Sequence, residues 1–432
     1  MSPPPKSRDD FHIGIVCALP LEYDALDYVI DEFWDSKKFG RLSGDPNIYT
    51  HGRIGDSNVV VVLLMGMGKV NAASATGSMR SSYPSLELVL LTGICGGVPM
   101  PGSGNEQLLG DVIVSKAVVQ YDFGRHYPED FAVKDTLEEC MRKPTTNIRN
   151  FIGQVQTDRA WARLEDRAAI HLDKLQITSK SGRRPTNYQW PGADRDRLFG
   201  SSYSHRHVSG CDTCSAGRSC QASRTLSCLE LGCENKALVQ RRRVEHKRRL
   251  EHAGRIKEAQ APSVFFGTIG SADTVLKYGL ERDRLAKAHN LIAFEMEGAG
   301  VWNQIPCIIV KGICDYADSH KNKYWQNFAA ATAASVSKAL IEQYPQTDRR
   351  TEPAARASDV DEGRFVQEEY GMGVNKRYAG YVENVKSWRS SEVWDQAAER
   401  DGCVIMKSVC DYVDGRKSKS SQDFAAATAA AV

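Results

Sequence analysis

The chain has 432 residues, of which 41% are hydrophobic and 25% charged, and its formal net charge is +2. These values are typical of a globular chain with one large domain and additions, or with two to three domains. The near-neutral charge predicts no binding to nucleic acid or to a membrane surface, and a membrane-spanning helix is excluded because no run of about 18 apolar residues occurs.

The N-terminal residues 1–10 are polar and rich in proline. They lack the apolar core of a secretory signal, so we expect a disordered lead-in and an intracellular, cytoplasmic protein. Thiols stay reduced in that compartment, and disulfides are therefore not expected among the 12 cysteines.

Short apolar runs alternate along the chain with stretches of helical character. Strands are expected at 11–17, 59–64, 86–91, 111–119, 264–269 and 306–313, and helices at 21–30, 70–79, 298–303 and 325–344. Because several strands are continuous apolar runs, the sheet that they form should be covered on both faces. The sequence therefore predicts an α/β fold whose ligand lies beyond the carboxyl ends of the strands.

Two glycine-rich turns directly follow predicted strands, and they contain Gly68 and Gly93. The first turn, 66–69, precedes a helix and is similar to a phosphate-binding loop. It lacks the first glycine of an ATPase loop, where Leu63 stands, and the serine or threonine after the lysine, where Val70 stands. An ATPase is therefore excluded, whereas a simple backbone cradle for a substrate phosphate stays open.

Residues 201–262 break the alternation, and we interpret them as an insertion within one domain that spans 11–345. The insertion contains Cys211-x-x-Cys214 with three further cysteines and two histidines nearby. Structural zinc is possible, but no second pair follows at finger spacing, so a thiol-rich loop without metal is favoured. The basic stretch 241–249 is interpreted as a solvated charged face, with a nuclear import signal as the alternative.

Residues 307–336 recur at 403–432, where 18 of 30 positions are identical without gaps. The second copy keeps Asp411 but has Ser421 where the first has Trp325, and no Glu-Met-Glu precedes it. We therefore expect a partial, catalytically silent repeat, joined to the domain by a linker or irregular region at 346–402.

Six segments in this order resemble the purine nucleoside phosphorylase/nucleosidase superfamily, especially its fungal branch and the methylthioadenosine/S-adenosylhomocysteine nucleosidases. They are residues 15–22, 66–73, 92–97, 110–115, 294–299 and 312–318. The resemblance implies a three-layer α/β/α sandwich with a central mixed sheet, a homo-oligomer, and cleavage of the N-glycosidic bond of a purine nucleoside or nucleotide. Fungal relatives often precede a nucleotide-binding oligomerisation domain; none is visible, so we expect a standalone or truncated chain.

The resemblance also implies the groups that carry out the reaction. Asp315 matches the aspartate that protonates purine N7, and Glu22 matches the glutamate that positions or activates water. Glu297 matches the glutamate that binds the ribose hydroxyls. Without the resemblance, the residues alone would suggest an aspartate that caps a helix and acids that suit a helix N-terminus.

Further contacts follow from the same comparison. Met296 would pack on the sugar, Glu295 belongs to the same Glu-Met-Glu motif, and Trp325 aligns with an aromatic that stacks on the base. The turns at 18–22 and 66–69 contain no arginine to grip phosphate. Hydrolysis without a cofactor is therefore favoured over phosphorolysis with inorganic phosphate as co-substrate. A catalytically inactive nucleoside sensor is a further alternative, because Ile94 replaces a serine of the nucleosidases.

Overall fold

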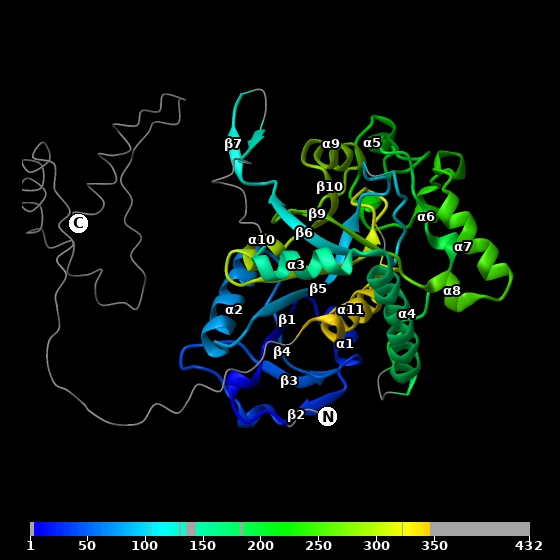
Figure 1. The fold of residues 1–432 in the computed structure, drawn as a ribbon. Helices are drawn as coiled ribbons and strands as arrows, with labels where there is room; N and C mark the ends of the chain where they lie inside the picture. Colours follow the sequence, from blue (N-terminus) through cyan, green and yellow to red (C-terminus); the bar gives the residue numbers. More distant parts are fainter. Residues whose placement is uncertain are drawn as a thin grey trace, which may run out of the picture. The chain divides into compact units, whose positions relative to one another are not determined.

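The computed structural model describes residues 4–345, apart from residues 103, 129–130, 135–143, 182–184 and 322. Figure 1 shows a central sheet with helices packed around it. The predicted linker at 346–402 and the predicted repeat at 403–432, with Asp411 and Ser421, lie outside the described residues.

The central sheet has nine strands in the order β10-β9-β6-β11-β5-β1-β4-β3-β2. Their bounds are β1 (Ile13–Cys17), β2 (Glu32–Trp34), β3 (Tyr49–Ile54), β4 (Ser57–Leu63), β5 (Leu88–Gly97), β6 (Val112–Gln120), β9 (Val264–Ser271), β10 (Leu291–Glu295) and β11 (Cys307–Asp315). Strands β4, β1, β5 and β11 run parallel, whereas β6 is antiparallel to β11 and β3 to β4. The sheet is therefore mixed, as expected. A separate pair joins β7 (Gly124–His126) and β8 (Phe131–Val133).

Helices cover the sheet on both faces. They are α1 (Pro20–Asp27), α2 (Lys69–Ser82), α3 (Thr146–Val155), α4 (Asp158–Lys180), α5 (Asp212–Ser215), α6 (Cys228–Leu231), α7 (Arg242–His252), α8 (Ile256–Gln260), α9 (Gly279–His289), α10 (Gly298–Trp302) and α11 (Gln326–Gln343). A Cβ on Gly312 would lie 2.0 Å from the Ala329 carbonyl oxygen of α11, and one on Gly298 of α10 would lie 2.4 Å from the Ile309 side chain. Positions 309 and 312 of one strand face opposite sides, so α10 and α11 lie on opposite faces. The predicted three-layer arrangement is confirmed.

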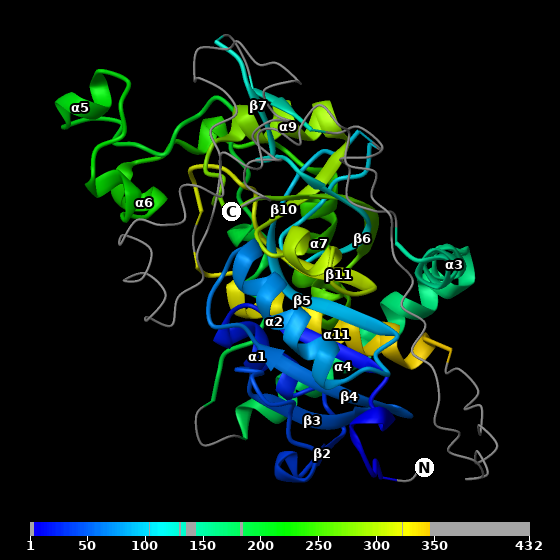
Figure 2. The same cartoon turned by 90° about the vertical axis from the view of Figure 1, so that its left-hand side faces the viewer.

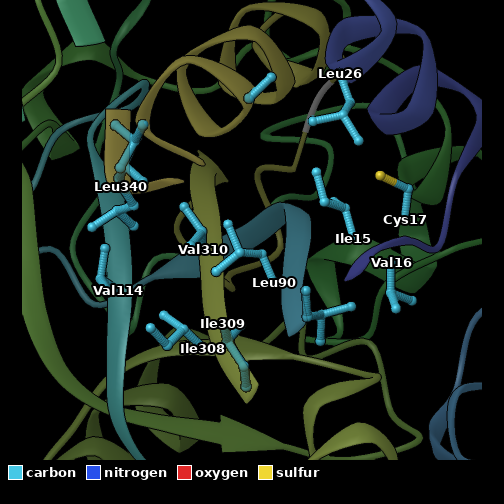
Figure 3. Close-up of a cluster of buried hydrophobic side chains, with 14 of the residues drawn as sticks. Ile15, Val16, Cys17, Leu26, Leu90, Val114, Ile308, Ile309, Val310 and Leu340 are labelled. Atoms are coloured by element: carbon cyan, nitrogen blue, oxygen red, sulfur yellow. The ribbon is translucent and has the colours of Figure 1, made fainter. Parts of the chain in front are cut away.

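The core lies between the central strands and α11. Figure 3 shows Val310 of β11 and Leu90 of β5 next to each other, with Leu340 of α11 on one side of them and Ile15 of β1 on the other. Full burial of each such aliphatic side chain contributes about 1.5–3 kcal/mol. This packing fixes the positions at which β1, β5 and β11 end, and therefore the positions of the turns that follow them.

Part of the inserted segment packs inward, which corrects one prediction. The basic stretch is not a solvated face throughout: the Arg241 side chain is 2% exposed and its Nη2 lies 2.8 Å from Asp196 Oδ1. Arg243 Nη2 donates to Asp111 Oδ1 at 3.1 Å. Buried guanidinium groups need such carboxylate partners, so these pairs attach α7 to the sheet. Figure 2 shows the shorter helices α5 and α6 to one side of the sheet.

Among the helices of the described residues, none combines the length and the apolar composition needed to cross a membrane.

Candidate active site

A pocket of about 170 Å³ lies at the carboxyl ends of β1, β5 and β11. The predicted residues that line it are Glu22, Glu295, Met296, Glu297 and Asp315. A larger hollow of about 980 Å³ lies against α3, α4 and the end of α11, and no predicted site residue lines it. The smaller pocket is therefore the candidate site, because it collects side chains from turns that are far apart in the sequence.

Glu22 is buried at the start of α1. Its Oε2 accepts the N–H groups of Ala18 and Leu19 at 2.8 and 2.9 Å, and its Oε1 accepts that of Ile94 at 2.8 Å. A Cβ on Gly93 would lie 2.1 Å from Glu22 Oε1, so only glycine leaves room for the carboxylate. Residues 92–97, expected as a glycine-rich turn, continue the strand β5. Glu22 thus joins the first turn to β5, and it suits the start of the helix as the residues alone suggested.

Burial raises the pKa of the Glu22 carboxyl above its usual range. The charge of Lys311 lowers the pKa, and the charge of Glu297 raises it. A carboxyl group whose pKa is raised in this way is a stronger base than an exposed glutamate, which suits proton transfer from water.

The Glu-Met-Glu motif joins β10 to α10. Glu295 accepts the N–H of Glu297 at 3.0 Å and that of Gly298 at 2.8 Å, so its carboxylate holds the turn in place. Glu297 Oε1 accepts the N–H of Gly68 at 3.3 Å, which explains how the first glycine turn is tied to the site. Met296 lines the pocket between the two glutamates.

Lys311 is a site residue that the sequence analysis missed. Its side chain is 1% exposed, and its Nζ lies 3.3 Å from Glu297 Oε2 and 3.9 Å from Glu22 Oε1. Burial alone would lower the pKa of Lys311, but the charges of Glu22, Glu297 and Glu295 outweigh it and raise the pKa. The amino group is therefore a charged ammonium that balances the buried carboxylates.

Two signals could have revealed Lys311. It interrupts the apolar run of β11, and a buried charge requires a partner. The same lysine also recurs in the second copy of the repeat, as Lys407.

Asp315 ends β11 and lies at the wall of the pocket. Its Oδ1 accepts the N–H of Ala317 at 2.8 Å, and Lys321 Nζ lies 3.1 Å from its Oδ2. Ala317 has a φ of 50°, a left-handed conformation that costs free energy outside glycine and here brings the N–H back to the carboxylate. Lys321 lines the same pocket, and it was also missed, although the repeat keeps it as Lys417.

The turn after Asp315 is held by buried contacts from elsewhere in the chain. The Tyr316 hydroxyl donates to Asp196 Oδ1 at 2.7 Å, and Arg282 Nη1 donates to the Tyr316 carbonyl oxygen at 2.9 Å. Arg241 bonds both the Tyr316 hydroxyl and Asp196. These contacts fix the direction that the chain takes after β11 ends at Asp315.

Trp325 lies outside the pocket, contrary to its predicted place against the base. Its ring is 1% exposed, it packs edge-on against Phe328 with centroids 5.9 Å apart, and its Nε1 donates to the Arg195 carbonyl oxygen at 3.1 Å. The next residue, Gln326, lines the pocket together with Phe294. The position of Trp325 is that of a core residue.

The cysteines singled out in the inserted segment lie apart from this pocket. Cys211 and Cys214 are brought together with His207 and Cys220, so that one ligand atom from each lies within 4.8 Å of the others. These four residues are the ones that could hold a metal ion.

Comparison with known proteins shows which families the chain is similar to. Residues 12–174 match the model of the phosphorylase superfamily. The chain is 29% identical over 346 residues to a nucleotide-binding leucine-rich repeat (NLR)-like protein of Hyaloscypha variabilis, covering 78% of this chain but only 30% of that protein. It is 22% identical over 338 residues to the 5′-methylthioadenosine/S-adenosylhomocysteine nucleosidase of Mycobacterium bovis, covering 77% of this chain and 96% of that enzyme.

Solved structures similar to the chain include futalosine hydrolase of Helicobacter pylori, at 15% identity and a TM-score of 0.44, covering 77% of this chain and 98% of that one. An S-adenosylhomocysteine nucleosidase of Streptococcus pyogenes has the same identity and TM-score, with 78% and 98% covered. The family match and the nucleosidase relatives show that the chain is similar to members of the phosphorylase superfamily.

Proposed function

We propose that this chain cleaves the N-glycosidic bond of a purine nucleoside or nucleotide by hydrolysis. The observation that carries the proposal is the meeting of Glu22, Glu297 and Asp315 at one pocket. The ammonium group of Lys311 lies beside the two glutamates, and that of Lys321 lies beside Asp315. The relationship to nucleosidases supports cleavage of an N-glycosidic bond in general. The specificity for a purine base and the use of water as the nucleophile are what we propose beyond that general activity.

Cleavage of the bond leaves positive charge on the sugar and negative charge on the base. We assign Asp315 as the acid for purine N7, and the position of its carboxyl group at the border of the pocket supports this role. Lys321, at 3.1 Å, holds the orientation of that group. Neutralising the departing base as the bond breaks is general acid catalysis, which typically contributes about 10²–10⁴-fold.

The sugar would lie against Glu297. Its carboxylate is buried and accepts from Gly68 and Lys311, and the remaining lone pairs are available to the ribose hydroxyls. A fixed negative charge beside the sugar also favours the positive charge that develops there.

Water would be activated at Glu22, whose raised pKa makes it a suitable base. The same charges disfavour phosphate as the nucleophile, because the buried carboxylates of Glu22, Glu295 and Glu297 surround a single ammonium, that of Lys311. No arginine occurs among the described residues that line the pocket. A phosphate dianion would therefore meet a net negative wall without the bidentate donors it prefers.

The test is incubation of the purified chain with adenosine, inosine, methylthioadenosine, AMP and ATP, with and without inorganic phosphate. Free purine base released at the same rate in both conditions supports hydrolysis. Release that requires phosphate would identify a phosphorylase, and binding without release would identify a nucleoside sensor; each of these outcomes contradicts the proposal.

Replacing Glu297 by glutamine should separate the two sugars. We expect kcat/KM to fall about 10- to 100-fold more for ribosides than for 2′-deoxyribosides, because a hydrogen bond to a charged group contributes about 1.5–3 kcal/mol. The measurement is kcat/KM for adenosine and for 2′-deoxyadenosine. Glu281→Gln, a change on α9 at a half-buried residue that does not line the pocket, is the matched control and should leave both unchanged. Equal losses for the two sugars would place Glu297 away from the hydroxyls.

A further inference from the structure

Four side chains of the inserted segment surround one point in space: His207, Cys211, Cys214 and Cys220. His207 Nδ1 lies 3.5 Å from Cys214 Sγ and 3.5 Å from Cys220 Sγ. In a tetrahedral zinc site, bond lengths of about 2.3 Å to sulfur and about 2.05 Å to nitrogen place these two ligand atoms about 3.6 Å apart. The two distances from His207 therefore match those of a zinc tetrahedron, and all four ligand atoms lie within 4.8 Å of one another.

The local backbone explains how the four ligands converge. Cys211 and Cys214 lie one turn apart at the start and within α5, so that both thiols face the same side. Gly217, with a φ of 82°, then reverses the chain and returns Cys220 to the pair. The N–H of Ser223 points at Cys220 Sγ at 3.4 Å, a contact that stabilises a thiolate.

The surrounding segment has little else to hold it together. Among residues 201–240, all of which the structure describes, the buried hydrophobic side chains are Cys214 and Leu231. Small units with so few buried apolar groups usually depend on a disulfide or a metal for their stability. The cysteines here are free thiols, which leaves the metal.

We propose that His207, Cys211, Cys214 and Cys220 bind one Zn²⁺ ion as a structural site. Three thiolates and one imidazole are the donors that zinc prefers, and four protein ligands leave no open position for a substrate. This inference is independent of the proposed hydrolase activity, because the four ligands lie outside the candidate active site.

The segment that contains the proposed zinc site also contacts the turn after Asp315. The N–H of His205, two residues before a ligand, donates to Ser319 Oγ at 2.9 Å. Phe199 stacks on His320 with ring centroids 4.0 Å apart. The segment that the metal would order is thus the one that packs on the turn after Asp315.

Zinc content of the purified full chain tests the proposal. Elemental analysis of the chain expressed with zinc in the medium should show bound zinc, and Cys220→Ser should contain one zinc fewer per chain. Cys228→Ser is the matched control: Cys228 belongs to a second set, with His205 and Cys233, that offers three ligand atoms rather than four. That variant should retain at least one zinc.

Two further measurements do not depend on the folding of a variant. Co²⁺ bound to the wild-type chain should show the ligand-field bands of a tetrahedral site and thiolate-to-cobalt charge transfer. Removal of the metal with a chelator should increase amide hydrogen exchange in residues 203–233 and 316–320, while β1 and β5 remain protected. A wild-type chain that binds neither zinc nor cobalt, or a Cys220→Ser chain with undiminished zinc, would overturn the proposal.

Discussion

Replacing Lys311 by methionine should lower the free energy of unfolding by about 3–5 kcal/mol at neutral pH, the cost of leaving a buried charge without its partner. The substitution keeps a side chain of similar length but removes the ammonium that lies 3.3 Å from Glu297 and 3.9 Å from Glu22. The measurement is urea unfolding of the wild type and the variant, with turnover assayed in parallel.

The loss should depend on pH in a defined direction. The pKa values of Glu22 and Glu295 are already raised, first of all by burial, and removal of the Lys311 charge would raise them further. Raised carboxyl pKa values mean that the folded state holds protons more tightly than the unfolded state. The stability linked to them is therefore present at low pH and is lost as pH rises through the raised values. The destabilisation of Lys311→Met should accordingly be smaller at about pH 5 than at about pH 8.

Two controls separate charge from shape in this experiment. Lys311→Arg retains the positive charge and should lose less stability than the methionine variant. Lys180→Met, at the exposed end of α4, should change stability by less than about 0.5 kcal/mol. A destabilisation of Lys311→Met that is the same at both pH values would show that the carboxylates do not depend on the ammonium.

Replacing Asp315 by asparagine should lower turnover on the order of a hundredfold or more, because the variant lacks the acid proposed for purine N7. The amide is close to isosteric and can still accept the N–H of Ala317, so substrate binding should change little. The measurement is kcat and KM for the release of adenine from adenosine, together with the dissociation constant of adenine.

Asp411→Asn is the matched control, since Asp411 occupies the equivalent position of the repeat without a Glu-Met-Glu before it. Its turnover should equal that of the wild type. A folded Asp315→Asn chain with unchanged turnover would remove Asp315 from the mechanism, and an equal loss in the Asp411 variant would show that the repeat contributes to a working site.

The strands were predictable because a strand that is buried on both faces of the sheet is a continuous run of apolar residues. The run expected at 306–313 becomes β11, and the expected pair at 59–64 and 86–91 becomes β4 and β5. Helices α3 and α4 were not predicted, because the apolar residues of α4, such as Leu164 and Leu172, form a narrow buried stripe among many charged neighbours. Such a stripe can be recognised only once the helix on which it packs is known, and here that helix is α11.

The candidate site was predictable only in part, and the resemblance supplied that part. Glu22, Glu297 and Asp315 do meet at one pocket. The lysine within the apolar run of β11 could have been noticed, but its pairing with Glu22 and Glu297 could not, because these partners lie far away in the sequence. Trp325 was misplaced for a different reason. It begins α11, and the direction of that helix turns the ring towards Phe328 and Gly110 rather than towards the pocket.

The carboxylate–ammonium set of Glu22, Glu295, Glu297 and Lys311 belongs to the folded core as much as to the proposed chemistry. A relative that lacks the proposed activity should still keep the four residues together, since losing one leaves the others with an uncompensated charge. Their presence in a relative therefore reports an intact fold rather than an active enzyme. The Asp315 side chain contacts Cys314, Ala317 and Lys321, and it would be free to change in a relative that does not need the proposed acid. On the proposed mechanism, we expect the residue at this position to distinguish a relative that cleaves nucleosides from one that only binds them.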